Sequence, residues 1–242
     1  MIKIFNIFSL LTLLVLFSCA NSGDLIKVAT DVLSQSSATT SLSSTEIARG
    51  LKQALEVGIK RGATTVSKPG GFLKNPLIKI PFPSQAKKVE KTLRSIGLGS
   101  LPDKFVASLN SAAEKASAKS IPIFVGAISK MSIQDAMGIL KGSGTEATQF
   151  MKKMTTGELT SLFRPIIKTS LAKVDATKYW GDITSKYNTI PFTKKVNVNL
   201  ESYVTSNALD GLFYTLGLEE QKIRKNPLKR TTALLKKVFS QI

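Results

Sequence analysis

Apolar residues recur at helical spacing along most of the chain beyond its first 44 residues, and this periodicity constrains the fold most. Ile47, Leu51, Leu55 and Ile59 follow one another at four-residue intervals, so an α-helix brings all of them to one face. The same patterning returns in segment after segment, and no segment has the marks of a sheet strand. The sequence therefore predicts an all-α fold, with a single compact multi-helix domain over residues 45–242.

Capping residues indicate where several of these helices begin. The pairs with capping-box spacing, in which a polar side chain bonds the free amides of the first turn, are Ser43 with Glu46, Ser132 with Asp135, and Thr155 with Glu158. Asn199 and either Thr231 or Thr232 are expected to begin the last two helices. Beyond the first helix, the predicted helical segments are 84–96, 100 onward, 121–130, 133–140, 146–154, 159–174, 176–188, 200–225 and 232–239, with a kink at Pro165.

One segment, residues 68–83, departs from this pattern. Its prolines and the pair Gly70–Gly71 forbid a helix, while Ile78, Ile80 and Phe82 alternate as in an extended chain. Because it is apolar, we expect an ordered loop that lies across the helices. Two interpretations stay open, a purely structural strap or a part of a binding surface.

Small residues form a ridge along the first helix of the domain. Gly50, Ala54, Gly58 and Gly62 repeat every four residues, although an interior glycine costs about 1 kcal/mol relative to alanine. Close packing of another helix explains such a ridge, and the alternative is a ligand that lies against the exposed backbone.

The first 19 residues have the organisation of a bacterial lipoprotein signal. Lys3 precedes the apolar stretch 4–17, which is too short to span a bilayer but long enough for the core of a signal peptide. Leu16 lies three residues before Cys19, and the small Ser18 lies directly before it. The alternative is an idle cysteine in an ordinary signal peptide.

On the lipoprotein interpretation, residues 1–18 are removed and Cys19 is acylated, so that residues 19–44 form a lipidated, flexible tether. Several acyl chains on one cysteine hold a protein to a membrane almost irreversibly. Ala20, where an Asp would signal retention at the inner membrane, favours the outer membrane with the domain facing the periplasm.

The composition excludes several kinds of chemistry. The chain has no histidine and a single cysteine, so it lacks an internal disulfide, a Ser-His-Asp arrangement and the usual metal ligands. Residues 142–147 match the letters of a dinucleotide-binding turn, but helical pattern precedes them where the motif needs a strand. We expect no cofactor, no metal and no catalytic residue. The acidic pair Glu219–Glu220 is expected to balance cations one turn later.

The net charge is strongly positive, with 34 basic against 16 acidic residues. The basic residues are 28 lysines and 6 arginines, and this excess of lysine disfavours a nucleic acid, which arginine recognises better. Two interpretations remain, solvated surface lysines or an anionic partner such as lipid headgroups, lipopolysaccharide or another polyanion. The stretch 222–237 holds seven basic residues and no acidic one. Aromatic residues beside lysines, here Tyr179, Trp180 and Tyr214, can form a groove for single-stranded nucleic acid or a glycan, and the alternative is that they are core residues beside solvated helix ends.

Five segments resemble the landmarks of a known bacterial family. They are Gly-Leu-Lys-Gln-Ala-Leu at 50–55, Lys-Pro-Gly-Gly-Phe-Leu at 68–73, Asp-Ala-Met-Gly-Ile-Leu-Lys-Gly at 135–142, Ala-Leu-Asp-Gly-Leu-Phe-Tyr at 208–214 and Ile-Arg-Lys-Asn-Pro at 223–227. This resembles the domain-of-unknown-function family 4197, from about residue 45 to 239. The resemblance implies one helical domain in an exported protein, often a lipoprotein. It implies no functional residues, because no activity is established for the family.

Together these observations favour a membrane-anchored binding module, monomeric or weakly associating, over an enzyme. The candidate binding residues come from the 68–83 loop and the last helices: Lys68, Gly70, Gly71, Phe72, Asp210, Tyr214, Arg224, Lys229, Arg230, Lys236 and Lys237. The alternative is an enzyme of unknown class, with a groove between the small-residue ridge and the Gly70–Gly71 loop in which Asp210, Tyr214 or Arg224 converge.

Overall fold

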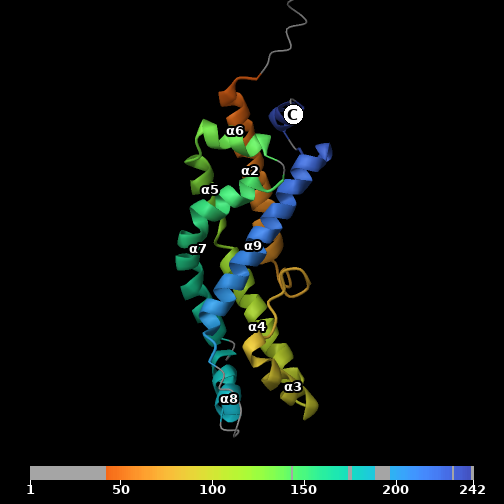
Figure 1. Ribbon diagram of the computed structural model, residues 1–242, viewed down its shortest axis with the longest axis vertical. Coiled ribbons are helices and arrows are strands. Elements are labelled where there is room, and N and C mark those ends of the chain that lie inside the picture. The colour runs from red at the N-terminus through yellow and green to blue at the C-terminus, as the bar shows by residue number, and fades with distance from the viewer. Residues whose placement is uncertain (1–41, 143, 174–175, 189–196, 231, 241–242) are drawn as a thin grey trace, which may run out of the picture. The chain divides into compact units, whose positions relative to one another are not determined.

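Helix α9, Leu200–Lys225, lies at the centre of the domain, and 13 of its 26 residues are buried against its neighbours. The computed structural model describes residues 42–142, 144–173, 176–188, 197–230 and 232–240. Three other long helices pack against α9 (Figure 1): α2, Ser44–Ser67; α4, Ser100–Ser117; and α7, Glu146–Lys173.

Shorter helices fill the spaces around these four. They are α3, Lys87–Ser95; α5, Ile121–Ser129; α6, Ile133–Lys141; α8, Ala176–Asn188; and α10, Ala233–Phe239. Two 3-10 turns, η1 at Ser84–Ala86 and η2 at Pro227–Lys229, precede α3 and α10. Helices α5, α6 and α10 pack on α2, while α8 packs on α7 and α4. All described residues belong to one compact unit, Leu42–Ile242, without a strand among them, so the predicted all-α domain is confirmed.

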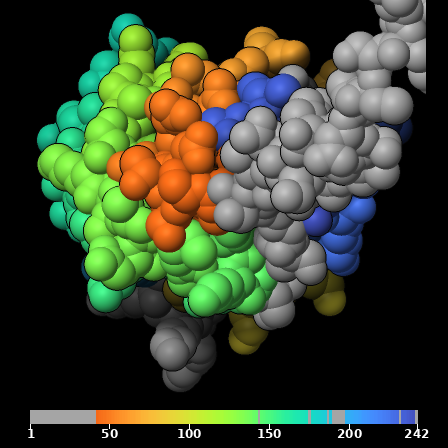
Figure 2. Space-filling model, turned by 90° about the horizontal axis from the view of Figure 1, so that it is seen from above, coloured from red at the N-terminus to blue at the C-terminus, as the bar shows by residue number. Residues whose placement is uncertain are grey.

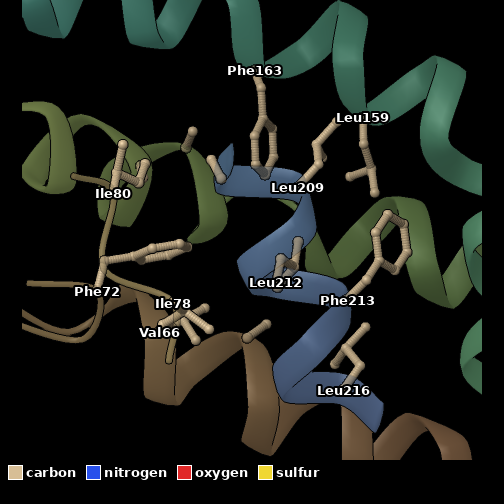
Figure 3. Close-up of a cluster of buried hydrophobic side chains, with 14 of the residues drawn as sticks. Val66, Phe72, Ile78, Ile80, Leu159, Phe163, Leu209, Leu212, Phe213 and Leu216 are labelled. Atoms are coloured by element: carbon tan, nitrogen blue, oxygen red, sulfur yellow. The ribbon is translucent and has the colours of Figure 1, made fainter. Parts of the chain in front are cut away.

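Residues 68–83, called the strap below, are ordered and cross the helices as predicted. Phe72, Ile78, Ile80 and Phe82 are all buried, and each such side chain contributes about 1.5–3 kcal/mol relative to an exposed one. Figure 3 shows the Phe72 ring pointing toward α9, and Phe72 and Ile78 both lie next to Gly211 of that helix. The alternation in the sequence therefore marks an extended segment that is fixed by burial.

Two buried polar side chains of α4 satisfy the backbone of the strap, which has no ladder of its own. The Asn110 amide accepts a hydrogen bond from the Ile80 N–H at 2.8 Å and donates one to the Ile80 carbonyl at 2.9 Å. The Glu114 carboxylate accepts from the Phe72 N–H at 3.1 Å. These bonds remove the cost of burying unpaired amides, about 1–3 kcal/mol for each group.

The small-residue ridge of α2 is explained by close helix packing. A Cβ on Gly50 would lie 2.9 Å from the side chain of Val238 in α10. On Gly62 it would lie 2.8 Å from the side chain of Leu216 in α9. The ridge therefore gives α9 and α10 access to the α2 backbone, and their side chains occupy the space where a ligand would have been.

Most predicted helix starts are confirmed. Ser43 with Glu46 and Ser132 with Asp135 each form a complete capping box, while Asn199 and Thr232 cap α9 and α10. The segment 84–96 begins with the 3-10 turn η1 before α3 continues it.

The helix start predicted at Thr155 and Glu158 is wrong. Helix α7 runs through this point without interruption, and the buried Thr155 hydroxyl donates to the carbonyl of Met151 at 2.7 Å. The buried residues of α7 keep a four-residue interval from Ala147 to Ile167, and Thr155 takes its place in that row. The continuous buried face therefore outweighs the local capping signal.

Candidate functional site

The strap glycines have a structural explanation at the end of α2. Gly70 has a φ of +81°, in the left-handed region that favours glycine. A Cβ on Gly71 would lie 2.5 Å from the carbonyl oxygen of Val66. The pair therefore lets the chain turn back tightly over α2, while the neighbouring Lys68 stays exposed.

The other candidate residues near the strap lie apart from one another. Phe72 is fully buried. A Cβ added to Gly211 would lie only 2.6 Å from the Phe72 ring, so the glycine makes room for that ring. Asp210 and Tyr214 are exposed on α9, and Arg224 lies 14 residues beyond Asp210, which is about 21 Å along a helix. The structure thus does not bring Asp210, Tyr214 and Arg224 together with the glycine loop.

Arg224 instead joins the end of α6 to α9. Its guanidinium donates to the carbonyl of Ile139 at 2.6 Å and to that of Gly142 at 3.0 Å. It also binds the carboxylate of Glu220, one turn earlier on α9, at 2.9 Å. A cation at these carbonyls complements the negative end of the α6 dipole.

Glu220 caps the start of α7, which is the positive end of that helix. Its carboxylate accepts from the N–H groups of Ala147 and Thr148, at 3.1 and 2.9 Å, and from the Thr148 hydroxyl at 2.8 Å. The predicted balance of Glu219 and Glu220 by nearby cations is confirmed, since Glu219 pairs with Lys222 at 2.6 Å. Arg224 and Glu220 thus hold the end of α6 and the start of α7, and a helix precedes the 142–147 motif, as predicted from the sequence.

The turn between α9 and α10 carries an exposed basic surface. We call this surface the basic tip, and its residues are Lys225, Leu228, Lys229, Lys236 and Lys237. Leu228 is 88% exposed, and the Asn226 side chain fixes the turn by accepting from the Leu228 N–H at 2.9 Å. A hollow of about 430 Å³ lies here, lined by Pro227, Leu228, Arg230 and Lys236.

Arg230 differs from the lysines around it, because it is bound within the domain. Its guanidinium donates to the carbonyls of Ile223 and Arg224 at 3.2 and 2.8 Å, which closes the end of α9. Its charged group also lies over the ring of Phe239, 4.9 Å from the centroid. Of the four predicted C-terminal cations, Lys229, Lys236 and Lys237 are exposed, whereas Arg230 is engaged in holding α10.

The basic tip lies at the end of the domain where α2 begins. Helix α10 packs on α2, and Leu234 and Val238 lie against Gly50 near the start of that helix. The pKa of Glu46 is lowered mainly by its bonds to the Ser43 backbone and hydroxyl, with smaller contributions from Arg49 and Lys237. Figure 2 looks onto this end and shows the start of α2 in orange beside α6 in green and the C-terminal helices in blue.

A second concave surface lies between α7 and α9, on another side of the domain. Four side chains on one stripe of α7 line it, namely Lys152, Thr156, Thr160 and Arg164. From α9 it is lined by hydroxyl side chains, Asp210, and the apolar Leu209 and Phe213. The volume of this α7–α9 groove is about 350 Å³, within the range of small-molecule sites.

Tyr179, Trp180 and Tyr214 do not share one surface. Trp180 is buried, and its ring stacks on that of Phe105 at a centroid distance of 5.2 Å. Tyr179 and Tyr214 are exposed, but they belong to different helices, α8 and α9. The predicted use of Tyr179, Trp180 and Tyr214 together on a single strand therefore lacks a common surface.

The comparisons with known proteins give the family. The family model described as "Protein of unknown function (DUF4197)" matches residues 41–240, which is most of the chain. The chain belongs to this family. No curated protein and no solved structure was found to match it. The DUF4197 match extends the predicted range of 45–239 slightly at both ends, and its description assigns no activity.

Two further features concern the described part of the chain, a metal site and a helix that spans a membrane. No group of three or more Cys, Asp or Glu residues there is placed to hold a metal ion. No single described helix has the length and hydropathy needed to cross a bilayer, although one bent pair of helical segments, 100–129 with 133–141, meets that test by length and composition.

The α7–α9 groove was not predicted from the sequence. Its α7 residues repeat at intervals of four, from Lys152 to Arg164, and this spacing could have indicated a polar stripe on one side of the helix. Nothing in the sequence shows that this polar stripe faces Thr205 and Asp210 of α9, because the pairing of the two helices is a long-range property. Cys19, the predicted lipid attachment site, lies outside the described residues.

Proposed function

We propose that this chain is a lipid-anchored protein of the bacterial cell envelope. In this proposal acylated Cys19 holds it in the membrane, and the basic tip binds the anionic phospholipid headgroups of that same membrane. The domain acts as a binding module, and the tip sets which of its faces meets the bilayer.

The observation that carries the proposal is the position of the basic tip. The tip lies at the end of the domain where α2 begins, just after Leu42 (Figure 1), and Cys19 precedes Leu42 in the chain. Residues 20–41 connect the two, and even a fully extended chain of that length reaches at most about 75 Å. A lipid on Cys19 would therefore hold the tip within that distance of the membrane, which raises its effective concentration at the headgroups.

The chemistry of the tip suits a membrane surface. A lysine near an anionic leaflet gains about 1 kcal/mol, so the four lysines together supply about 4 kcal/mol, or roughly a thousandfold. Leu228 adds an apolar side chain that protrudes among these charges, as in proteins that insert into the boundary between headgroups and acyl chains. This attraction is modest by itself and becomes effective because of the anchor.

The first test concerns the anchor. Cys19→Ala removes the acylated sulfur, so we expect loss of acyl labelling and either an uncleaved precursor or a protein outside the membrane fraction. Labelling with a radioactive fatty acid, followed by fractionation, measures both. Equal labelling and equal cleavage in the variant would show that Cys19 is not the lipid attachment site.

The second test concerns the basic tip. The lipidated protein is reconstituted into vesicles of neutral phospholipid, with or without phosphatidylglycerol, and amide hydrogen exchange is followed in η2 and α10. We expect slower exchange there only with the anionic lipid, and loss of this protection when Lys229, Lys236 and Lys237 are changed to Gln. Arg230 is left unchanged, because it holds α10 to α9.

A matched control changes the same charge elsewhere. Lys87, Lys88 and Lys91 are exposed on α3, at the other end of the domain from α10 (Figure 1), and their change to Gln should leave the protection intact. Protection that is equal in both triple variants, or that does not weaken as salt rises, would refute headgroup binding by the tip. Protection that requires lipopolysaccharide rather than phosphatidylglycerol would refute the assignment to phospholipid.

A further inference from the structure

The α7–α9 groove is lined by three kinds of group: cations, hydroxyl groups and apolar side chains. Cations stand toward its two ends, Lys152 and Arg164, which are 12 residues or about 18 Å apart along α7. Hydroxyl side chains line the walls between them. Leu209 and Phe213, which are largely buried, form its apolar floor. The groove is independent of the basic tip and of the lipid anchor.

The hydroxyls of α7 present oxygen atoms that accept hydrogen bonds. Thr156 already donates its hydroxyl hydrogen to the carbonyl of Lys152, and Thr160 donates its own to the carbonyl of Thr156 at 2.7 Å. Their oxygens are left with free lone pairs, and the carboxylate of Asp210 adds a further acceptor. A ligand of the groove therefore needs hydrogen-bond donors of its own, such as hydroxyl groups.

Thr205 on α9 supplies the observation that points to a ligand. Its side chain lines the groove and is only 3% exposed, yet its hydroxyl is buried with no hydrogen-bond partner. Other buried helical threonines bond the carbonyl four residues earlier, for example Thr155 to Met151 and Thr215 to Gly211. Leaving a buried hydroxyl unpaired is unfavourable, and because the Thr205 oxygen has almost no exposed surface, a ligand would satisfy it only after the side chain turns its hydroxyl toward the groove.

The charges of the groove indicate that the ligand is anionic. Asp210 pairs with Lys152 across an N–O distance of 3.8 Å, so one cation is partly neutralised. Arg164 takes part in none of the ion pairs within the described ranges, and its planar guanidinium suits a carboxylate or a phosphate. The anionic group would thus lie toward Arg164, and donor groups would lie toward Asp210.

We propose that the α7–α9 groove binds an acidic sugar, either a uronate or a sugar phosphate. Its hydroxyls donate to Thr156, Thr160, Thr205 and Asp210, its anionic group pairs with Arg164, and its C–H face lies on the apolar floor. An inorganic anion such as phosphate has too few hydrogen-bond donors to use all of these acceptors, and it would be repelled by Asp210. An acyl chain would leave every polar group of the groove unpaired.

The test uses the purified full chain and ligand-detected NMR titrations with four probes: glucuronate, glucose 6-phosphate, glucose and inorganic phosphate. We expect glucuronate or glucose 6-phosphate to bind at least tenfold more tightly than glucose and inorganic phosphate. Equal binding of inorganic phosphate, equal binding of glucose, or no binding of either acidic sugar at millimolar concentration would overturn the proposal. A partner protein that occupies the groove while both sugars fail to bind would do the same.

Two pairs of variants separate binding from folding. Thr205→Val should raise the melting temperature, because it removes an unpaired buried hydroxyl, and should weaken sugar binding about tenfold. Thr215→Val removes a paired hydroxyl outside the groove and should leave the affinity unchanged. Arg164→Gln should weaken binding tenfold or more, whereas Lys168→Gln, one turn beyond the groove, should not. Unchanged affinity in both Thr205→Val and Arg164→Gln would refute the site.

Discussion

Arg224→Met should lower the stability of the domain strongly, because it breaks a buried network that joins three helices. The side chain of Arg224 is 13% exposed and that of its partner Glu220 is 7% exposed. Methionine keeps an apolar chain similar to the aliphatic part of arginine, so the change removes the charge and the bonds to the carbonyls of Ile139 and Gly142. It leaves Glu220 as a buried carboxylate without its cation.

Breaking one partner of a buried ion pair costs about 3–5 kcal/mol. Glu220 keeps its bonds to the first amides of α7, so we expect the lower end, about 3 kcal/mol. For a domain of this size, such a loss lowers the melting temperature by roughly 6–12 °C. Thermal unfolding followed by far-ultraviolet circular dichroism measures it, together with urea titration for the free energy of unfolding.

A matched control on the same helix is Lys222→Met. Lys222 pairs with Glu219 at 2.6 Å, but its side chain is 56% exposed, and such pairs contribute about 0–1 kcal/mol. The double variant Glu220→Gln with Arg224→Met should lose less than the sum of the two single changes. If Arg224→Met and Lys222→Met unfold at the same temperature, the assigned role of the network is wrong.

Two further changes test local structure. Gly71→Ala should cost roughly 1–3 kcal/mol, because its Cβ would lie 2.5 Å from the carbonyl oxygen of Val66, whereas Gly126→Ala in α5 meets nothing within 4 Å and should gain about 1 kcal/mol. Urea unfolding of both variants gives the comparison. The pKa of Asp135 lies below its ordinary value of 3.8, mainly through the Ser132 hydroxyl, so its contribution is present above that pH and disappears as pH falls through the folded-state pKa. Asp135→Asn should therefore flatten the fall of the melting temperature below about pH 4, and an unchanged acid profile would contradict this role.

The parts of the fold that could be predicted from the sequence depend on neighbours in the chain. Ser43 and Glu46 lie three residues apart, so their capping box needs no knowledge of the rest of the molecule. The alternation of Ile78, Ile80 and Phe82 likewise showed an extended, buried segment. The same local logic failed at Thr155, where the continuous buried face of α7 decided the structure.

The parts that could not be predicted depend on residues far apart in the sequence. Glu220 caps α7 from 73 residues away, and Asn110 reaches the strap across 30 residues. The helical period showed that Gly50 and Gly62 permit close packing, but it did not show that α10 and α9 are the helices they meet. The candidate site has the same limit. A run of basic residues does not show that Arg230 is bound within the domain while the neighbouring lysines are exposed.

The central claim, that the basic tip meets the membrane that holds the anchor, is tested most directly by a polarity-sensitive dye at position 228. Cys19 is the only cysteine of the chain, so once it is acylated, Leu228→Cys provides a single free thiol for the dye. The matched position is Ile96→Cys, where the native side chain is 63% exposed beyond α3, at the opposite end from α10 (Figure 1). In vesicles that contain phosphatidylglycerol, we expect the emission of the dye at 228 to shift to shorter wavelength, with no shift at 96 and none in neutral vesicles. The same shift at both positions, or no shift at 228 in the anionic vesicles, would contradict the account.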